Sequence, residues 1–397
     1  GLLLNDQILA QLLVSWTMGL LCILTIYSIG IFLFNKNAAL VGVLIWYGTY
    51  SVAFLAQSAK IDLAWAAFDL LALYAFMQWY FSDLSKGKTK WLMLAGLFLG
   101  IAGGIKQVSL FTIILLMLAI TFRLFGKKEH SIITLIKSYS AFFIPVSIAG
   151  IWVIRSYLLT ETVPYSGGNL PNNHGILGFF QTLWQMSMLG NAISLEGPMG
   201  KSIGPGVLAL VPVVLCFKNV DRRVLHILGY CSLMLILWYN GVQRARHLLP
   251  TIALLSLVAG YVVHLLISQK PKIGHTVLMF VVLSIGLNLG PWVYVNYFSM
   301  DRFGYVFGKH NLDEYLKENL TKWDWYPNYE MTIKIRDELP KDVKIAALST
   351  GNSYYLNQPF YCPGPSMLAE AWIQDSSQYP DPQEFYNKLI NFGITHV

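Results

Sequence analysis

Long apolar runs separated by short polar stretches dominate the sequence from its N-terminus to about residue 300. A helix that crosses a bilayer needs roughly 20 apolar residues, and many of the runs reach or approach that length. The pattern predicts about ten membrane segments, at residues 9–34, 38–56, 63–81, 91–104, 106–124, 139–159, 204–217, 224–240, 248–267 and 275–298. We therefore expect a polytopic α-helical membrane protein.

The connections between these segments alternate in charge. One set carries most of the cations: Lys36; Lys86, Lys88 and Lys90; Arg123, Lys127, Lys128 and Lys137; Lys218, Arg222 and Arg223; Lys270 and Lys272. Loops rich in lysine and arginine stay on the cytoplasmic side of a membrane. The opposite connections, among them the long one from 160 to 203, are therefore expected outside, in an inner or plasma membrane crossed many times.

After about residue 300 the composition becomes polar, which indicates a water-exposed region. Periodicity predicts helices at 311–320, 329–338 and 382–392, and strands at 343–348, 354–357 and 394–397. We expect a transmembrane domain at 1–299 and a small extracytoplasmic α/β domain at 300–397. Both ends read as interrupted, so we expect a further helix and outer loop before Gly1 and a truncated C-terminal domain.

Composition supports a membrane protein and excludes several function classes. Hydrophobic residues make up 55% of the chain and charged residues 12%, against roughly 25% charged residues in soluble domains. The net charge of +7 follows from loop topology, so we expect no nucleic-acid partner. GxxxxGK[ST], GxSxG and HExxH motifs are absent from the sequence. Any chemistry is therefore expected on the membrane domain, and the sequence does not indicate whether a metal takes part.

Two carboxylates mark the predicted third segment. Asp62 lies at its outer mouth beside Lys60, and Asp69 lies two helical turns further along the same face. A charge near hydrocarbon costs several kcal/mol unless it has a partner or a task. Asp62 can line a cavity or cap the helix N-terminus. Asp69 can line the same cavity as Asp62 or make a structural hydrogen bond between helices.

A glycine-rich stretch ends in a lysine. Gly96, Gly100, Gly103 and Gly104 precede Lys106 within an apolar stretch too long for one span, and the charge pattern predicts an outward-facing hairpin there. A lysine at such a tip suits a phosphate as a point charge. The alternative is close helix packing through the glycines with a lysine that reaches toward water.

A basic group begins the ninth segment. Arg244, Arg246 and His247 stand directly before its apolar run. Arginine binds phosphate oxygens through paired hydrogen bonds, which predicts an anionic headgroup as the ligand. Anchoring to lipid headgroups without catalysis is the alternative, and His247 alone is weak evidence for a metal.

The predicted outer loop at 160–203 carries Phe179, Phe180 and Trp184. Long loops in compact domains are usually functional or mobile. Aromatic side chains there can contact sugars or acyl chains, or can anchor the chain at the membrane interface.

Several of these stretches together resemble the GT-C superfamily of integral-membrane glycosyltransferases, in particular bacterial proteins similar to protein mannosyltransferases and to the lipid A aminoarabinose transferase. The matching pieces follow the family order and are Ala59-Lys60-Ile61-Asp62-Leu63-Ala64, Gly96 to Lys106, Ile154-Arg155-Ser156-Tyr157 to Pro164-Tyr165, Ser202-Ile203-Gly204-Pro205, Arg246-His247-Leu248-Leu249-Pro250 and Gly393-Ile394-Thr395-His396-Val397. Three positions depart from the family pattern: Ser156, the Glu161–Pro164 stretch and His247.

The resemblance implies transfer of a sugar from a polyprenyl-phosphate-linked donor to an acceptor hydroxyl at the outer face. Lys106, Arg244 and Arg246 would hold the donor phosphate, Asp62 would contact the acceptor or the sugar, and Lys60, Asp69 and His247 would support them. In this family the main catalytic acid lies in the first outer loop. That loop would precede Gly1, so we expect the residues shown here to be inactive by themselves.

Two other functions fit the same cations. A non-enzymatic transporter of a lipid or another anionic solute would also bind an anionic headgroup, although the sequence shows no inverted halves of the transporter kind. A catalytically silent GT-C homologue is the second alternative. The donor sugar, the acceptor and any divalent metal are not identified by the sequence.

Overall fold

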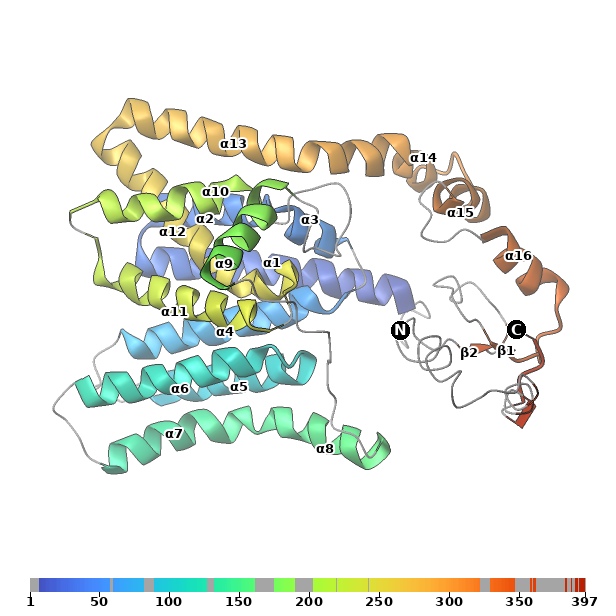
Figure 1. The fold of residues 1–397 in the computed structure, drawn as a ribbon, viewed down its shortest axis with the longest axis horizontal. Coiled ribbons are helices and arrows are strands. Elements are labelled where there is room, and N and C mark those ends of the chain that lie inside the picture. Colours follow the sequence, from blue (N-terminus) through green and yellow to red (C-terminus); the bar gives the residue numbers. More distant parts are fainter. Residues whose placement is uncertain are drawn as a thin grey trace. The chain divides into compact units, whose positions relative to one another are not determined.

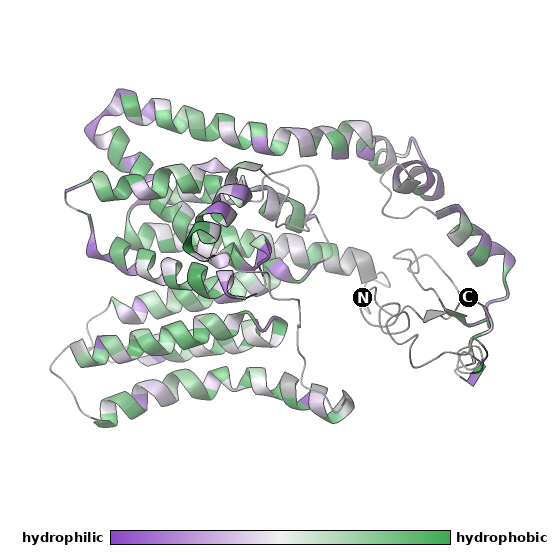
Figure 2. Cartoon of the chain, in the orientation of Figure 1, coloured by the Kyte–Doolittle hydropathy of each residue, from purple (hydrophilic) through white to green (hydrophobic). Residues whose placement is uncertain are grey.

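The computed structural model describes residues 7–57, 60–81, 89–126, 132–160, 175–189, 203–218, 220–241, 243–321, 329–346, 358, 360–361, 383, 387, 390–391 and 393–396. The chain divides into two compact units, Gly1–Trp292 and Val293–Val397. The first unit is a bundle of apolar helices, and the second is smaller and more polar (Figures 1 and 2).

Most helices of the first unit coincide with predicted apolar runs. They are α1 (Gln7–Leu33), α2 (Lys36–Tyr47), α3 (Tyr50–Ala56), α4 (Asp62–Tyr80), α5 (Thr89–Ile105), α6 (Ser109–Gly126), α7 (Ile132–Val146), α8 (Ile148–Thr160), α9 (Gly175–Trp184), η2 (Gln185–Leu189), α10 (Pro205–Leu210), η3 (Val211–Cys216), α11 (Arg222–Tyr239), η4 (Ala245–Leu248), α12 (Leu249–Gln269) and α13 (Pro271–Val293). Helices prevail because hydrocarbon offers no hydrogen-bond partner to an unpaired backbone group.

Not every predicted segment is a full-length span. In the described part of the chain, four helical stretches are long and apolar enough to cross a membrane, and a fifth qualifies if α2 and α3 are counted as one bent span. The four are Leu12–Leu33, Ile132–Ile151, Ala245–Gln269 and Pro271–Ser299. Shorter apolar helices cover Thr89–Ile105, Ser109–Phe125 and Pro205–Cys216. A polytopic helical architecture is confirmed, while the number ten stays a prediction.

The segment predicted at 38–56 is not one helix. It consists of α2 and α3, which meet at an angle of 73°. The break falls at Gly48 and Thr49, and the Thr49 hydroxyl donates a hydrogen bond to the Trp46 carbonyl at 2.8 Å. A Cβ atom at position 48 would lie 2.7 Å from Ile285 on α13. A larger side chain at this bend would therefore displace the Ile285 side chain, a tertiary constraint that the hydropathy pattern does not show.

The segment predicted at 139–159 has different bounds in the structure. Helix α7 begins at Ile132, and the chain is interrupted at Ser147 before α8. Pro145 lies inside α7 and lacks the backbone N–H that a continuous helix requires at that position. The polar residues near the start of α7, among them Lys137 and Ser138, hid its first turns from the hydropathy pattern.

The connection predicted as a loop at 160–203 contains the helix α9, so the loop prediction is wrong for that part. The Tyr239 hydroxyl on α11 donates to the Gly175 carbonyl at 3.2 Å, and the Phe179 ring contacts the Tyr239 ring with centroids 5.4 Å apart. Phe180 and Trp184 are exposed. Residues 161–174 and 190–202 of the same connection lie outside the described residues.

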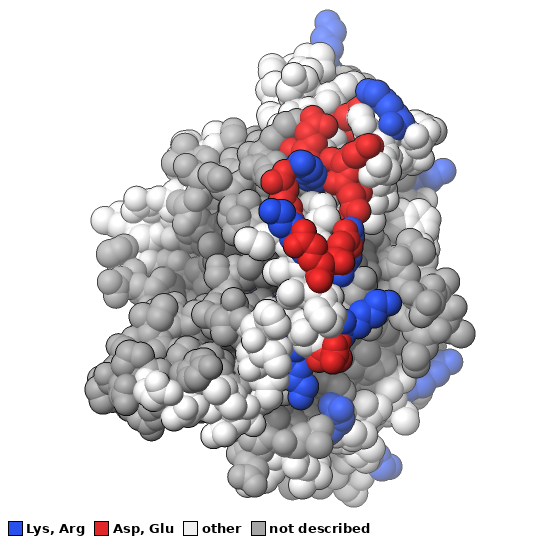
Figure 3. Space-filling view, turned by 90° about the vertical axis from the view of Figure 1, so that its right-hand side faces the viewer, with Lys and Arg blue, Asp and Glu red and all other residues white. Residues whose placement is uncertain are grey.

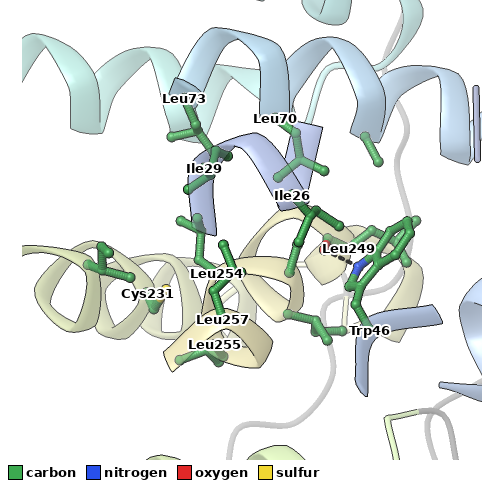
Figure 4. Packing of buried hydrophobic residues seen from close by; sticks show 14 of the residues in the cluster. Ile26, Ile29, Trp46, Leu70, Leu73, Cys231, Leu249, Leu254, Leu255 and Leu257 are labelled. Carbon is green, nitrogen blue, oxygen red and sulfur yellow. Dashed lines mark hydrogen bonds between the residues drawn. The ribbon is translucent and has the colours of Figure 1, made fainter. Parts of the chain in front are cut away.

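Helix α12 lies at the centre of the bundle and packs against α1, α2, α4, α10 and α11. At Gly260 a Cβ atom would collide with the backbone of Ala38 and Gly42 on α2, so this glycine permits the close approach of the two helices. The Trp46 indole donates to the Leu249 carbonyl at 3.1 Å and joins the same helices (Figure 4). Ile26, Leu70 and Leu257 line the surrounding apolar cluster.

Glycines also set the distance between α5 and α7. A Cβ atom at Gly96 would collide with the Phe142 carbonyl, and one at Gly100 would lie 2.7 Å from the Pro145 carbonyl. Gly104 has open space around it. The packing interpretation of the glycine-rich stretch is therefore confirmed for its first two glycines, and it leaves open what Lys106 does at the end of the stretch.

The second unit contains η5 (Tyr294–Ser299), α14 (Arg302–Val306), α15 (Leu312–Thr321), α16 (Tyr329–Glu338), β1 (Ile345–Ala346) and β2 (Phe360–Tyr361). The strands pair in parallel with Ile345 opposite Phe360, and Ile345 also bridges to His396. The helices predicted at 311–320 and 329–338 are confirmed. Within the predicted strand 343–348, β1 covers Ile345–Ala346, and residues 347 and 348 lie outside the described residues. Residues 354–357, predicted as a strand, and most of the predicted helix 382–392 lie outside the described residues, so the α/β class of this unit stays a prediction.

Ionic contacts connect α15 and α16 in this unit. The Arg336 guanidinium lies 2.9 Å from Asp313 Oδ2, and the Tyr329 hydroxyl donates to Asp313 Oδ1 at 2.7 Å. The hydrogen bond from Arg336, followed by that from Tyr329, lowers the pKa of the Asp313 carboxyl. Acidic side chains, with basic ones among and around them, gather on the face that Figure 3 shows, as expected for a surface in water.

Candidate functional site

Three charged side chains from different elements meet in the first unit. Asp62 is the first residue of α4, Lys106 directly follows α5, and Arg246 lies in the short 3₁₀ helix η4. The Lys106 ammonium forms an ion pair with Asp62 Oδ1, and Arg246 Nε lies 3.8 Å from the same oxygen. We call these three residues the cation site.

The carboxylate of the cation site is more buried than its two partners. The Asp62 side chain is 5% exposed, whereas those of Lys106 and Arg246 are each 18% exposed. Among the described residues, two cations face this one carboxylate. A buried carboxylate requires such compensation. The two cations, on the more exposed side chains, make this place suited to an anionic ligand.

The capping interpretation of Asp62 is wrong. The N-cap residue of α4 is Ile61, and Asp62 is the first residue inside the helix. A negative charge in the first turn is favourable because it interacts with the helix dipole. The preceding chain is held by a hydrogen bond from the Ser15 hydroxyl on α1 to the Lys60 carbonyl at 3.0 Å. The Asp62 carboxylate is therefore directed at Lys106 by tertiary contacts rather than by a cap.

The structure has a turn between two helices at Lys106, as predicted, and the outward direction of its tip stays a prediction. Helix α5 ends at Ile105, the Lys106 N–H donates to the Ala102 carbonyl at 2.8 Å, and α6 begins at Ser109. The Lys106 ammonium lies 5.4 Å from the centroid of the Trp65 ring. This is a distance at which a cation is attracted to an aromatic face.

Sequence reasoning missed Trp65. This side chain is fully buried, and its indole N–H donates to the Ser109 hydroxyl oxygen at 2.7 Å. The available signal was its spacing, since residues three apart on a helix lie on the same side and Trp65 follows Asp62 by three. Trp65 thus belongs to the floor beneath Lys106.

The basic group of η4 divides into residues with different surroundings. Ala245 and Leu248 are fully buried and hold η4 against the bundle, and Arg246 joins the cation site. The Arg244 carbonyl accepts hydrogen bonds from the Trp238 indole at 3.0 Å and from the His247 N–H at 2.9 Å. Among the described residues, the guanidinium of Arg244 makes no ion pair with an acidic group. The structure therefore brings Arg246, but not Arg244, to Asp62.

The remaining predicted site residues lie apart from these ion pairs. The fully buried Asp69 accepts a hydrogen bond from the Thr112 hydroxyl on α6 at 3.2 Å, and Thr112 lies 3.2 Å from the Tyr230 hydroxyl on α11. This favours the structural interpretation of Asp69. The Lys60 ammonium lies 4.8 Å from the centre of the Phe54 ring. Within the described part of the chain, no group of three or more His, Cys, Asp or Glu residues is arranged to hold a metal ion.

Among the described helices, two apolar pockets that are partly open to the surroundings are relevant to the site. One of about 170 Å³ is bounded by α10, α11 and α12 and reaches Leu248, two residues after Arg246. The other, of about 490 Å³, is lined by the later turns of α4 together with α6 and α11, including Phe76, Phe122 and Tyr230. The smaller cavity therefore adjoins the element that carries Arg246.

Comparison with known proteins identifies the fold. The sequence model of the dolichyl-phosphate-mannose-protein mannosyltransferase family matches residues 2–155. No match to a curated protein sequence was found. The crystal structure of ArnT from Cupriavidus metallidurans in the apo state is similar, with a TM-score of 0.52 and 12% identity over 95% of this chain and 76% of that chain.

ArnT from the same organism bound to undecaprenyl phosphate gives a TM-score of 0.53 and 12% identity, over 96% of this chain and 76% of that chain. The oligosaccharyltransferase of Archaeoglobus fulgidus, tethered with an acceptor peptide, gives a TM-score of 0.41 and 14% identity, over 88% of this chain and 52% of that chain. The resemblance stated from the sequence motifs is thereby confirmed at the level of the fold: this chain is a polytopic membrane protein with the fold of the GT-C glycosyltransferases.

Proposed function

We propose that this protein is a glycosyltransferase that moves a sugar from a polyprenyl-phosphate-linked donor to a lipid, glycan or protein acceptor at the extracytoplasmic face. The observation that carries the proposal is the convergence of Lys106 and Arg246 on Asp62. The similarity to a structure of ArnT bound to undecaprenyl phosphate supports a polyprenyl phosphate as the ligand class.

The chemistry of the cation site suits a lipid phosphate. Arginine binds phosphate oxygens through paired hydrogen bonds, and lysine acts as a compact point charge. The apolar cavity lined by Leu248 offers hydrocarbon surface on the short helix η4 that also carries Arg246. A ligand with a charged head and an apolar chain would satisfy both surroundings at once.

In the proposed reaction the cations stabilise the phosphate that leaves as the glycosidic bond breaks. Charge that develops in a transition state is stabilised most effectively by groups already held in place. Lys106 and Arg246 would fill this role, and Arg244 would join them at the edge of the site. Asp62 would accept a hydrogen bond from a hydroxyl of the sugar or the acceptor, while Lys60, Asp69 and His247 would support the surrounding structure.

The proposal is tested by lipid binding and sugar transfer. We expect the purified intact protein in nanodiscs to retain undecaprenyl phosphate, but not the uncharged undecaprenol, in native mass spectrometry. We also expect it to transfer sugar from a polyprenyl-phosphate-linked donor in membranes that contain its acceptors. Asp337→Ala, in the second unit, serves as a control and should leave both readings within about twofold, because surface ion pairs contribute little.

Equal retention of undecaprenyl phosphate and undecaprenol in native mass spectrometry would contradict the proposed ligand. Binding of the phosphate without any sugar transfer, across a panel of polyprenyl-linked sugars, would instead favour the transporter or the silent homologue.

The proposed orientation gives a separate prediction. In a background without the native cysteines, Lys272→Cys should be shielded from a membrane-impermeant thiol reagent in intact cells, and Lys341→Cys in the second unit should react. Both positions are exposed, so protection would report the side of the membrane rather than burial. Equal labelling of the two positions would show that the loop charge pattern assigns the sides wrongly.

A further inference from the structure

The cation site contains one carboxylate oxygen shared by two cations, and this arrangement constrains how an anion enters. We propose that donor binding exchanges an ion pair: the phosphate takes the Lys106 ammonium from Asp62, and the Asp62 carboxylate becomes available to a hydroxyl only when the donor is bound. This inference rests on the proposed function and adds an order of events to it.

The two contacts to Asp62 differ in kind. Lys106 forms a close ion pair with Oδ1 that includes a hydrogen bond. Arg246 approaches the same oxygen through Nε at 3.8 Å, which is longer than a hydrogen bond. A phosphate that arrives at the two cations therefore competes with Asp62 for the Lys106 hydrogen bond, while the contact to Arg246 is electrostatic and need not be broken.

Lys106 is placed so that this exchange needs little movement of the backbone. Its N–H is fixed to the Ala102 carbonyl, and its ammonium lies over the face of Trp65. The ammonium group of lysine is carried on a flexible four-carbon chain, and a cation can shift across an aromatic face without losing the attraction. Because Trp65 is locked by its hydrogen bond to Ser109, it supplies the same floor before and after the exchange.

The exchange links the two substrates. Before the donor binds, the Asp62 carboxylate is 5% exposed and engaged with Lys106, so it is a poor partner for a hydroxyl. Once the phosphate holds Lys106, the carboxylate has lost its closest partner and is able to accept a hydrogen bond from a hydroxyl of the sugar or the acceptor. Donor binding would thereby precede productive binding of the acceptor.

Asp62→Asn in the intact protein tests the exchange directly. Asparagine keeps the shape and removes the competing negative charge, so the affinity for undecaprenyl phosphate in nanodiscs should rise by about three- to tenfold, even though sugar transfer falls. Asp69→Asn is the matched control: it removes a carboxylate two turns further along the same helix, where the partner is the Thr112 hydroxyl, and should give no such rise. A fall in affinity for Asp62→Asn would overturn the proposal.

A double-mutant cycle with Lys106→Gln separates exchange from a purely structural role of Asp62. If the phosphate must take Lys106 from Asp62, the loss caused by Lys106→Gln should be larger in the Asp62→Asn background than in the wild type, by a factor of about three or more. If Asp62 only positions Lys106, the loss should be smaller in that background, and this result would overturn the exchange. Absence of undecaprenyl phosphate binding by the wild type would instead reject the proposed function itself.

Discussion

Lys106→Ala and Arg246→Ala should each lower the affinity for undecaprenyl phosphate and the rate of sugar transfer by about tenfold to hundredfold. Both side chains converge on one carboxylate at the mouth of α4. A charge-assisted hydrogen bond to a phosphate contributes about 1.5–3 kcal/mol, which corresponds to that range of affinity. The measurement is the lipid titration in nanodiscs, combined with sugar turnover.

Matched variants separate a lost phosphate contact from a damaged fold. Lys60→Ala removes a nearby cation that lies over the Phe54 ring, and it should change the affinity by less than about threefold. The loss of affinity caused by Arg244→Ala should fall between these limits, since this arginine is absent from the ion pairs with Asp62. Lys106→Gln retains a hydrogen-bond donor for the buried Asp62. It should give a monodisperse protein that binds undecaprenyl phosphate as weakly as Lys106→Ala does. Wild-type affinity in both alanine variants would reject the phosphate site.

Trp65→Leu should also have a large effect: it should lower both the stability of the protein and its affinity for undecaprenyl phosphate. The buried ring would be replaced by a smaller side chain, and the Ser109 hydroxyl would lose the indole N–H that it accepts. Large-to-small changes of buried aromatic residues cost about 3–5 kcal/mol when the replacement is alanine, so leucine should cost about 2–4 kcal/mol of unfolding free energy in detergent. The affinity for undecaprenyl phosphate should fall by about two- to tenfold, because Lys106 loses an aromatic face.

Trp65→Phe tests whether Trp65 positions Lys106 or only fills space. Phenylalanine keeps an aromatic face but has no N–H, so the phosphate affinity should return to near the wild-type value while part of the stability loss remains. Ser109→Ala is the companion variant, since it removes the acceptor and leaves the Trp65 ring in place. Equal phosphate affinity for the leucine and phenylalanine variants would show that the ring face contributes nothing to the site.

The helical parts of this protein could be predicted from the sequence because their cause is local. Apolar runs must form helices in hydrocarbon, and α1, α5, α6 and α12 begin and end within a few residues of the predicted bounds. In the polar unit, α15 and α16 could be predicted from their amphipathic periodicity, which is also a local property of the sequence. The break at Gly48 and Thr49 escaped prediction because hydropathy does not distinguish a bent apolar segment from a straight one, and α9 escaped because its short apolar pattern lay within a connection of mixed polarity.

The residue types of the candidate site could be predicted from the sequence, whereas their arrangement in space could not. Sequence alone identified Asp62, Lys106 and Arg246 as charges that hydrocarbon would not tolerate without a partner or a task. It also selected Arg244 on the same grounds, and it interpreted Asp62 as a possible cap. Each of these inferences used only the neighbours of a residue along the chain.

Only the tertiary structure joined Asp62 to Lys106, which is 44 residues away, and brought Arg246 from a third element to the same oxygen. It also placed Trp65 beneath Lys106 and separated Arg244 from the carboxylate. The physical reason is that hydropathy and helix periodicity depend on a residue and its near neighbours, and these determine where helices form. The pairing of charges depends instead on how helices approach one another, and glycines such as Gly96 and Gly260 set that approach through contacts between segments far apart in the chain.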